Sequence, residues 1–520
     1  MRFVKECGFA MLAVLALAGS ALGARDPGAS VTWPSGTAVV SYESERALAA
    51  ALERHPAQVI RRIPALRVAA LRPHGNVERY AHQIGAEAGI VRVDRAAARR
   101  SLVEPALTSL ASTAPFQWQY AAVHADQVPS SVAEAAAGFT IAVIDTGADL
   151  AAPDLGAKTP HTFSVRSRGA DVTDANGHGT FVAALAAGSS SNAEGIAGVG
   201  GEAKLMVVQA GNSTGSFTDV EEAAAIVYAV DHGAKIINLS LGGTSTSSIE
   251  KRAVDYAVSK GVLLVAAVGN GYPDGNPVEY PAALLQPVGS NGVGGRGLSV
   301  AASTREGARA AFSATGSHVS LAAPGANVFS AVAASSSTSR YPRTALPGSL
   351  GGLYGYGSGT SFAAPQVAGA AALVWAANPG LRADEVASIL EQSASGQGSW
   401  NAELGYGVLD VAAAVARAQQ TPVTAAPAPQ AAPPELRLSG RRVGTRVALW
   451  WLAPSGAVRY RVSVSSGGIQ RVLAAAATRR SATYALTSGN YRFTVAALDA
   501  SGQQLAVSTP WSVTVPRLNR

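Results

Sequence analysis

Between Phe116 and about Gln420 the chain alternates continuous apolar segments with helical ones, and this alternation constrains its fold most strongly. Buried strands are expected at 139–145, 204–209, 235–241 and 262–269, and helices at 179–188, 219–232 and 247–260. Strands that are apolar throughout and alternate with helices are typical of a parallel sheet covered on both faces. The sequence therefore predicts an α/β fold with a doubly wound, mostly parallel sheet.

The length and charge of the chain limit what else it can be. Its 520 residues exceed what one ordinary hydrophobic core accommodates, so we expect two or three domains. The formal net charge is +7, but the arginines are scattered and form no sustained basic run interleaved with aromatic residues. We therefore expect no nucleic-acid partner.

The N-terminal 24 residues have the pattern of a secretory signal peptide. Arg2 and Lys5 precede an apolar run from Gly8 to Ala18, and small residues follow up to Ala24. An uncleaved anchor is the alternative, although the run is short for a membrane span, and no other segment is apolar enough to span. The single cysteine lies inside this segment. The predicted mature protein is extracellular or periplasmic and has no disulfide bonds.

The remaining regions divide into a small domain before the alternating region and another after it. Residues 25–115 contain an α+β pattern at about 38–94, followed by an Ala/Arg/Ser-rich stretch, 95–115, that we interpret as an exposed linker. The alternating domain is expected at 116–420. A Pro/Ala-rich linker occupies 421–434. Residues 435–520 alternate with period two between Gly, Ser and Asn turns, which predicts a β-sandwich.

Four polar residues carry the chemistry of the alternating domain. Asp145 ends a buried strand, His178 lies between glycines at a helix start, Asn270 follows another buried strand, and Ser361 opens a helix in "GTSFAAP". A serine hydroxyl becomes a nucleophile when an imidazole takes its proton and a carboxylate orients that imidazole. A side-chain amide and a backbone N–H can stabilise the resulting oxyanion. The set therefore predicts Asp145 as orienting acid, His178 as general base and acid, Ser361 as nucleophile and Asn270 as oxyanion donor.

Each of these residues also has an interpretation without catalysis. Ser361 and Asp145 could be helix or turn caps, His178 a helix-start residue and Asn270 a turn residue. The fragment "IDTG" also occurs in aspartic proteases, but those need two such aspartates on a β-rich fold, and this chain has one on an α/β pattern. The joint occurrence of all four residues at the strand ends of one domain favours the catalytic interpretation.

The order Asp…His…Asn…Ser, with these flanking residues, resembles the subtilisin-like serine protease (subtilase) family over about 116–415. The resemblance implies a serine endopeptidase that acts through an acyl-enzyme and needs no cofactor for catalysis. It also implies that Ser240, Leu241 and Gly242, in "INLSLGG", pair with an extended peptide substrate, as in strand addition to a sheet edge.

The two flanking domains also have counterparts in the resemblance. The small N-terminal domain is similar to the family's propeptide, an intramolecular chaperone and inhibitor that is removed by self-cleavage. "WWLAP", "YRVSV" and "NYRFTVAALDASG" make the last domain similar to a fibronectin type III module. The expected product is a secreted monomer, made as a self-processed zymogen, that acts on protein and peptide substrates.

Three further residues are candidates for calcium binding or substrate selectivity, and each also has a simpler interpretation. The resemblance places Asp154 and Asn192 at positions of calcium ligands, although a capping aspartate and a turn asparagine would account for them equally. It places Glu279 at the base of the pocket for the side chain that precedes the cut bond. A carboxylate there would favour Arg or Lys, whereas a solvent-facing rim glutamate would have no such effect.

A catalytically dead binding or adhesion protein on the same fold is the alternative of a different class. Such a protein would be expected to have lost one or more of the four polar residues, and none is lost here.

Overall fold

The computed structural model describes residues 36–102, 104–105, 116–192, 195–336, 340–344, 353–422, 436–452, 457–466, 469–499, 504–508 and 511–516. The predicted signal peptide, including Cys7, and nearly all of the Pro/Ala-rich linker lie outside these residues. The chain divides into two units, Met1–Val423 and Thr424–Arg520, which are considered separately. No helix among the described residues has the length and apolar character needed to cross a membrane.

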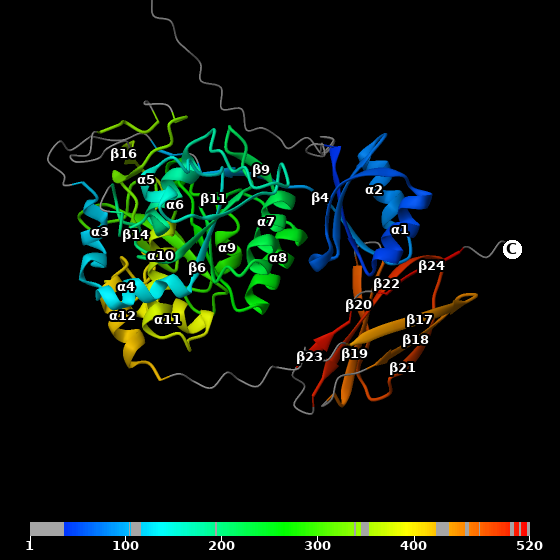
Figure 1. Cartoon of the computed structure of the whole chain (residues 1–520). Helices are drawn as coiled ribbons and strands as arrows, with labels where there is room; N and C mark the ends of the chain where they lie inside the picture. The colour runs from blue at the N-terminus through cyan, green and yellow to red at the C-terminus, as the bar shows by residue number, and fades with distance from the viewer. Residues whose placement is uncertain are drawn as a thin grey trace, which may run out of the picture. The chain divides into compact units, whose positions relative to one another are not determined.

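The N-terminal part of the first unit is a small α+β domain, coloured blue in Figure 1. It contains an antiparallel sheet in the order β2-β3-β1-β4. Both helices begin at residues whose side chains cap them, Ser44 and Asn76, because each oxygen accepts an otherwise unpaired backbone N–H. Its elements are β1 (Ala38–Tyr42), α1 (Glu45–Arg54), β2 (Ala57–Ile63), β3 (Val68–Pro73), α2 (Val77–Gly85) and β4 (Ile90–Arg95).

The larger part of this unit is built on a seven-stranded parallel sheet in the order β14-β13-β12-β10-β6-β8-β7. The predicted α/β fold is confirmed. The sheet strands are β6 (Thr140–Asp145), β7 (His161–Ser164), β8 (Lys204–Gln209), β10 (Ile236–Leu239), β12 (Leu263–Ala267), β13 (Leu298–Ser303) and β14 (Leu321–Pro324). Short strands outside it are β5 (Ala98–Ser101), β9 (Ser216–Thr218), β11 (Leu241–Gly242), β15 (Val328–Ala331) and β16 (Tyr354–Gly357).

Helices cover both faces of this sheet because successive strand residues point to opposite sides. Ile141 and Val143 of β6 belong to a core shared with α6 and α10, whereas Ala142 and Ile144 belong to a core shared with α7 and α8. The helices are α3 (Trp118–Ala122), α4 (Ser130–Ala135), α5 (Pro153–Gly156), α6 (His178–Ala187), α7 (Asp219–Asp231), α8 (Ser248–Ser259), α9 (Ala282–Leu285), α10 (Thr360–Ala377), α11 (Ala383–Ser393) and α12 (Val411–Gln420).

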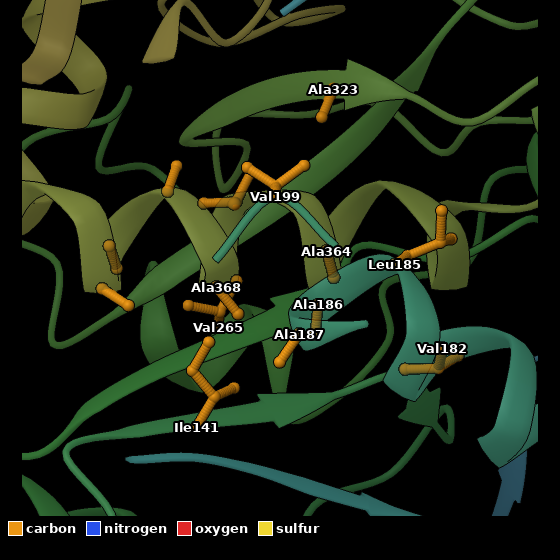
Figure 2. Close-up of a cluster of buried hydrophobic side chains, with 14 of the residues drawn as sticks. Ile141, Val182, Leu185, Ala186, Ala187, Val199, Val265, Ala323, Ala364 and Ala368 are labelled. Atoms are coloured by element: carbon orange, nitrogen blue, oxygen red, sulfur yellow. The ribbon is translucent and has the colours of Figure 1, made fainter. Parts of the chain in front are cut away.

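Close packing of small side chains holds α10 in the middle of the first core. Ala364 and Ala368 of α10 lie near Ala186 and Ala187 of α6 in the close-up of this cluster (Figure 2). A Cβ on Gly369 would come within 2.6 Å of a backbone nitrogen of the facing loop and 2.8 Å of a carbonyl oxygen of α6. Larger side chains on this face would push the helix away, so small residues are needed where α10 packs against α6.

The second unit is a β-sandwich, as expected from its period of two. One sheet has the order β17-β18-β21, and in the other β22 pairs with β19, β23 and β24 while β19 also pairs with β20. Trp451 of the first sheet and Tyr460 and Phe493 of the second share its core. The strands are β17 (Arg437–Val443), β18 (Arg446–Leu452), β19 (Arg459–Ser466), β20 (Ile469–Ala477), β21 (Ser481–Ala485), β22 (Gly489–Leu498), β23 (Gln504–Val507) and β24 (Trp511–Val515).

Candidate active site

Asp145 and His178 form a buried hydrogen-bonded pair at the carboxyl end of the sheet. Asp145 is the last residue of β6 and His178 the first of α6. Nδ1 of His178 lies 2.8 Å from Oδ1 and 2.9 Å from Oδ2 of Asp145. Because an ionised carboxylate only accepts hydrogen bonds, the imidazole donates from Nδ1, which leaves Nε2 as the basic nitrogen of the neutral ring.

The environment of His178 adjusts its basicity in two opposing ways. Burial alone would lower the pKa of the imidazole, but the charge and hydrogen bond of Asp145, helped by the charge of Glu104, raise that pKa above its ordinary value. The imidazolium form is therefore stabilised once it forms. This is the property that a general base needs when it takes a proton from a nucleophile.

Asp174 holds the start of α6 in place and was not predicted from the sequence. Its Oδ1 accepts hydrogen bonds from the backbone N–H of Gly177 and the hydroxyl of Thr146. Its Oδ2 accepts from the N–H and the hydroxyl of Thr180. Both ends of the segment around His178 are thus tied to one buried carboxylate. In the sequence, only the position of Asp174 four residues before His178 could have indicated this role.

Ser361 is the second residue of α10, and its main chain and side chain both contact Ser240. Pro365 has no N–H to donate to the carbonyl oxygen of Ser361, as a residue four positions on in a helix normally would. The hydroxyl of Ser240 donates to that carbonyl instead, at 2.7 Å. The Ser361 hydroxyl donates to the carbonyl oxygen of Ser240 at 3.4 Å. Ser361 does not cap the helix, since Gly359 occupies the N-cap position.

Asn270 lies beside the same helix start. Its Oδ1 accepts both the backbone N–H and the hydroxyl of Thr360, each at 2.9 Å. Two donors on the oxygen fix which end of the amide is the acceptor, so the NH₂ end points elsewhere. Phe362 follows Ser361 in α10, and the centroid of its ring lies 5.8 Å from the centroid of the His178 ring. The structure thus brings together all four of the predicted residues around the first turn of α10.

The basic nitrogen of His178 makes no hydrogen bond among the described residues. Oε1 of Glu104 lies 3.9 Å from it. Glu104 is held there by Arg340, whose Nε donates to Oε2 at 2.9 Å, and by the hydroxyl of Tyr341. The chain's own residue 104 therefore lies next to the candidate general base. Glu104, Arg340 and Tyr341 were not singled out from the sequence.

The segment 98–102 occupies the edge predicted to bind substrate, and our interpretation of it as an exposed linker was wrong. Strand β5 pairs antiparallel with β11 on one side, where Ser101 faces Leu241 and Arg100 faces Gly242, and with β9 on the other. Burial alternates along β5, and Leu102 is buried just beyond it. The backbone hydrogen bonds of two neighbouring strands order this segment, which no local sequence period could indicate.

Glu279 lies beside Leu102 rather than on a solvent-facing rim. A Cβ on Gly242 would meet Glu279 Oε2 at 2.6 Å and Leu102 Cδ2 at 2.9 Å. Glu279 is buried, and burial raises the pKa of its carboxyl, against a smaller lowering by the charge of Arg100. The neutral carboxylic acid is compatible with a leucine side chain, and the ionised form would suit a cation.

Asp154 and Asn192, the two candidate calcium ligands, are neighbours. Asp154 is buried, and its oxygens accept from the N–H of Ile196 and the hydroxyl of Tyr354. Burial raises the pKa of this carboxyl to about 6, against hydrogen bonds that include one from Asn192. No group of three or more His, Cys, Asp or Glu side chains suited to a metal occurs among the described residues. A cation here would depend largely on backbone oxygens.

Comparisons with known proteins agree with this geometry. The family model described as "Subtilase family" matches residues 136–407, slightly more than half of the chain. A thermophilic serine proteinase from Bacillus sp. (strain AK1) is 36% identical over 272 residues, which are 52% of this chain and 60% of that protein. Thermitase from Thermoactinomyces vulgaris is 36% identical over 267 residues, 51% of this chain and 84% of thermitase.

A solved structure extends the likeness beyond the matched region. Fervidolysin from Fervidobacterium pennivorans, a keratinolytic enzyme related to subtilisin, aligns with a TM-score of 0.64 and 21% identity. The alignment covers 89% of this chain and 87% of that one, which supports the fold of the chain. Taken with the family match, these findings show that the chain belongs to the subtilase family of serine endopeptidases.

Proposed function

We propose that this chain is a secreted serine endopeptidase in which Ser361, His178 and Asp145 form the catalytic triad. The observation that carries the proposal is the buried pairing of His178 with Asp145 beside the first turn of α10. The hydroxyl oxygen of Ser361 attacks the peptide carbonyl while Nε2 of His178 takes its proton. The imidazolium then protonates the leaving amine, and water hydrolyses the acyl-enzyme by the same route.

In this proposal, the side-chain amide of Asn270 and a backbone N–H at the start of α10 donate hydrogen bonds to the oxyanion. Charge develops on the former carbonyl oxygen as the tetrahedral intermediate forms, and fixed donors stabilise it without reorganising. Thr360 supports this role because it holds the acceptor end of the Asn270 amide. Ser240, Leu241 and Gly242 would pair with the backbone of the substrate, as β11 pairs with β5.

The first 102 residues act, in this proposal, as signal peptide and propeptide. Segment 98–102 lies along the substrate edge in the manner of a peptide, and Glu104 lies at His178 on the far side of the candidate cut. We therefore propose that the chain is cut after Leu102, within the stretch 95–115 predicted from the sequence. The N-terminal domain would then remain as an inhibitor until it is degraded. The two-sheet sandwich supports a fibronectin type III-like module at the C-terminus.

Labelling with a fluorophosphonate tests the proposed nucleophile directly. The reagent should form one stoichiometric adduct with the processed protein, and peptide mapping should place it on Ser361. The processed protein should also hydrolyse casein. Absence of labelling together with absence of hydrolysis would instead support the alternative of a binding protein on the same fold.

We predict that Glu279 makes selectivity for the residue before the cut depend on pH. Because burial raises the pKa of its carboxyl, Glu279 loses its charge over a pH range that lies above the ordinary range of a glutamate, and regains it as the pH rises through that range. The ratio of kcat/KM for substrates with Arg and with Leu at that position should therefore rise over this range. Glu279→Gln should make the ratio independent of pH. A profile that is the same for both proteins would refute this role.

We predict a structural calcium ion bound by Asp154 and Asn192. The buried Asp154 carboxyl has no basic side chain paired with it among the described residues, so a cation would offset its burial. Chelation should lower the Tm of the wild-type protein by several degrees, and added Ca²⁺ should restore it. Asp154→Asn should remove this response. A Tm that is insensitive to chelator in the wild type would contradict the prediction.

A further inference from the structure

Arg99 is the most completely buried cation described, although it belongs to the segment that we propose is cut away. It lies in β5 with no exposed side-chain surface. Its Nε donates to Oε2 of Glu222 at 2.9 Å, and its Nη2 lies 2.7 Å from Oε2 of Glu250. The neighbouring Arg100 is exposed. Two adjacent arginines of one strand thus have opposite environments, because successive side chains point to opposite faces.

The residues around Arg99 form what we call the acidic pocket, lined by Asp219 and Glu222 of α7 and Glu250 of α8. All three carboxylates are fully buried. Within the described part of the chain, Arg99 is the one basic side chain paired with them, and Oε1 of Glu222 and Oε1 of Glu250 accept no hydrogen bond. The pocket therefore holds more acidic groups than its one occupant can pair with.

The acidic pocket belongs to the peptidase domain, whereas Arg99, which occupies it, belongs to the segment that we propose is removed. Removal of the segment would leave β9 and β11 each without their shared partner strand and the acidic pocket without its cation. A peptide that adds to this edge in the same register would place its fourth residue before the cut where Arg99 lies, counting back from Leu102. Buried carboxylates left without a partner favour an occupant that brings a positive charge.

From this arrangement we infer that the acidic pocket is a specificity site that selects arginine at the fourth position before the cut bond. A guanidinium can donate to two carboxylates at once through its planar fork, which Lys cannot do. The chain's own residues 99–102 then serve as a template of the preferred substrate. The inference rests on the proposed peptidase function and adds a selectivity that the triad does not provide.

Peptides that copy residues 99–104 test this selectivity in the processed wild-type enzyme. The series Xaa-Arg-Ser-Leu-Val-Glu, internally quenched and cut after Leu, carries Arg, Lys, Gln or Leu as Xaa. We expect kcat/KM for Arg to exceed that for Gln or Leu by roughly 10- to 100-fold, the range for charge-assisted hydrogen bonds, with Lys between them. As a matched control, the same four residues are placed at the third position before the cut, the counterpart of exposed Arg100, where we expect changes within about threefold.

Enzyme variants identify the pocket as the cause. Glu250→Gln should reduce the advantage of Arg over Leu to a few-fold. Asp255→Asn removes the same charge from the exposed side of α8 and should leave the preference unchanged. The wild-type series needs no variant, so the inference remains testable if Glu250→Gln fails to mature.

The outcomes separate this inference from the proposed function. Equal cleavage of all four peptides would overturn the selectivity and leave the peptidase intact, with the acidic pocket serving only to anchor the chain's own segment. Cleavage of none of them, by an enzyme that also fails to hydrolyse casein, would overturn the proposed function itself. A preference for Arg that Glu250→Gln does not diminish would also reject the acidic pocket as its origin.

Discussion

Replacing Ser361 with alanine is expected to lower kcat by roughly a million-fold, the loss found in subtilisin when its serine or histidine is removed. The reason is that alanine has no hydroxyl to attack the peptide carbonyl and form the acyl-enzyme. Residual hydrolysis would come from oxyanion stabilisation and substrate binding alone. Hydrolysis of a quenched peptide, measured at enzyme concentrations high enough to detect slow turnover, checks this.

The control for this variant is Ser358→Ala, three residues earlier in the chain. The Ser358 hydroxyl accepts the backbone N–H of Asn327 and takes no part in the proposed chemistry. Its replacement should leave kcat within a few-fold of wild type. If Ser361→Ala retains more than about one per cent of wild-type activity after purification from other proteases, Ser361 is not the nucleophile.

The second large effect is expected for Asp145→Asn, which should lower kcat by about 10⁴-fold near neutral pH. The asparagine amide can donate to Nδ1 of His178, and this would move the ring proton to Nε2, where the base must accept one. The structure should otherwise change little, since the two side chains have the same shape. Steady-state kinetics with the quenched peptide, together with a Tm measurement, separate lost chemistry from lost folding.

Asp149→Asn is the matched control for that change. Asp149 follows β6 by four residues and accepts the backbone N–H groups of Ala151 and Ala334, so its carboxylate has a structural role. We expect its variant to keep kcat within about tenfold. Equal activities for the two variants would show that the Asp145 carboxylate does not orient the imidazole.

The fold was predictable wherever local periodicity determined it. Strand β8 and helix α7 agree with their predicted bounds to within a residue, because continuous apolar strands and capped helices are read directly from the sequence. In the sandwich, the predicted period of two is hard to see in β17 and β20. The strand at 437–443 is rich in Arg and Gly, and the one at 469–477 ends in a run of alanines. Neither composition marks a strand by itself.

The site was predictable as a set of residues but not as an arrangement. Asp145, His178, Asn270 and Ser361 lie at strand ends and helix starts, where the chain order places them together. Ser361 is a helix-start residue as expected, but the capping alternative does not hold, because Gly359 precedes the helix. The burial of Arg99 depends on acids more than a hundred residues away in the chain. Such tertiary contacts leave no local signal in the sequence.

The intact mass and N-terminal sequence of the purified protein test the central claim most directly. If the chain is a self-processing serine endopeptidase, the wild-type product should begin at Val103, and Ser361→Ala should retain the preceding domain. Removal of residues 98–102 would also open the acidic pocket to substrate. A Ser361→Ala protein that, without any added protease, is cut at the same bond as the wild type would contradict the account.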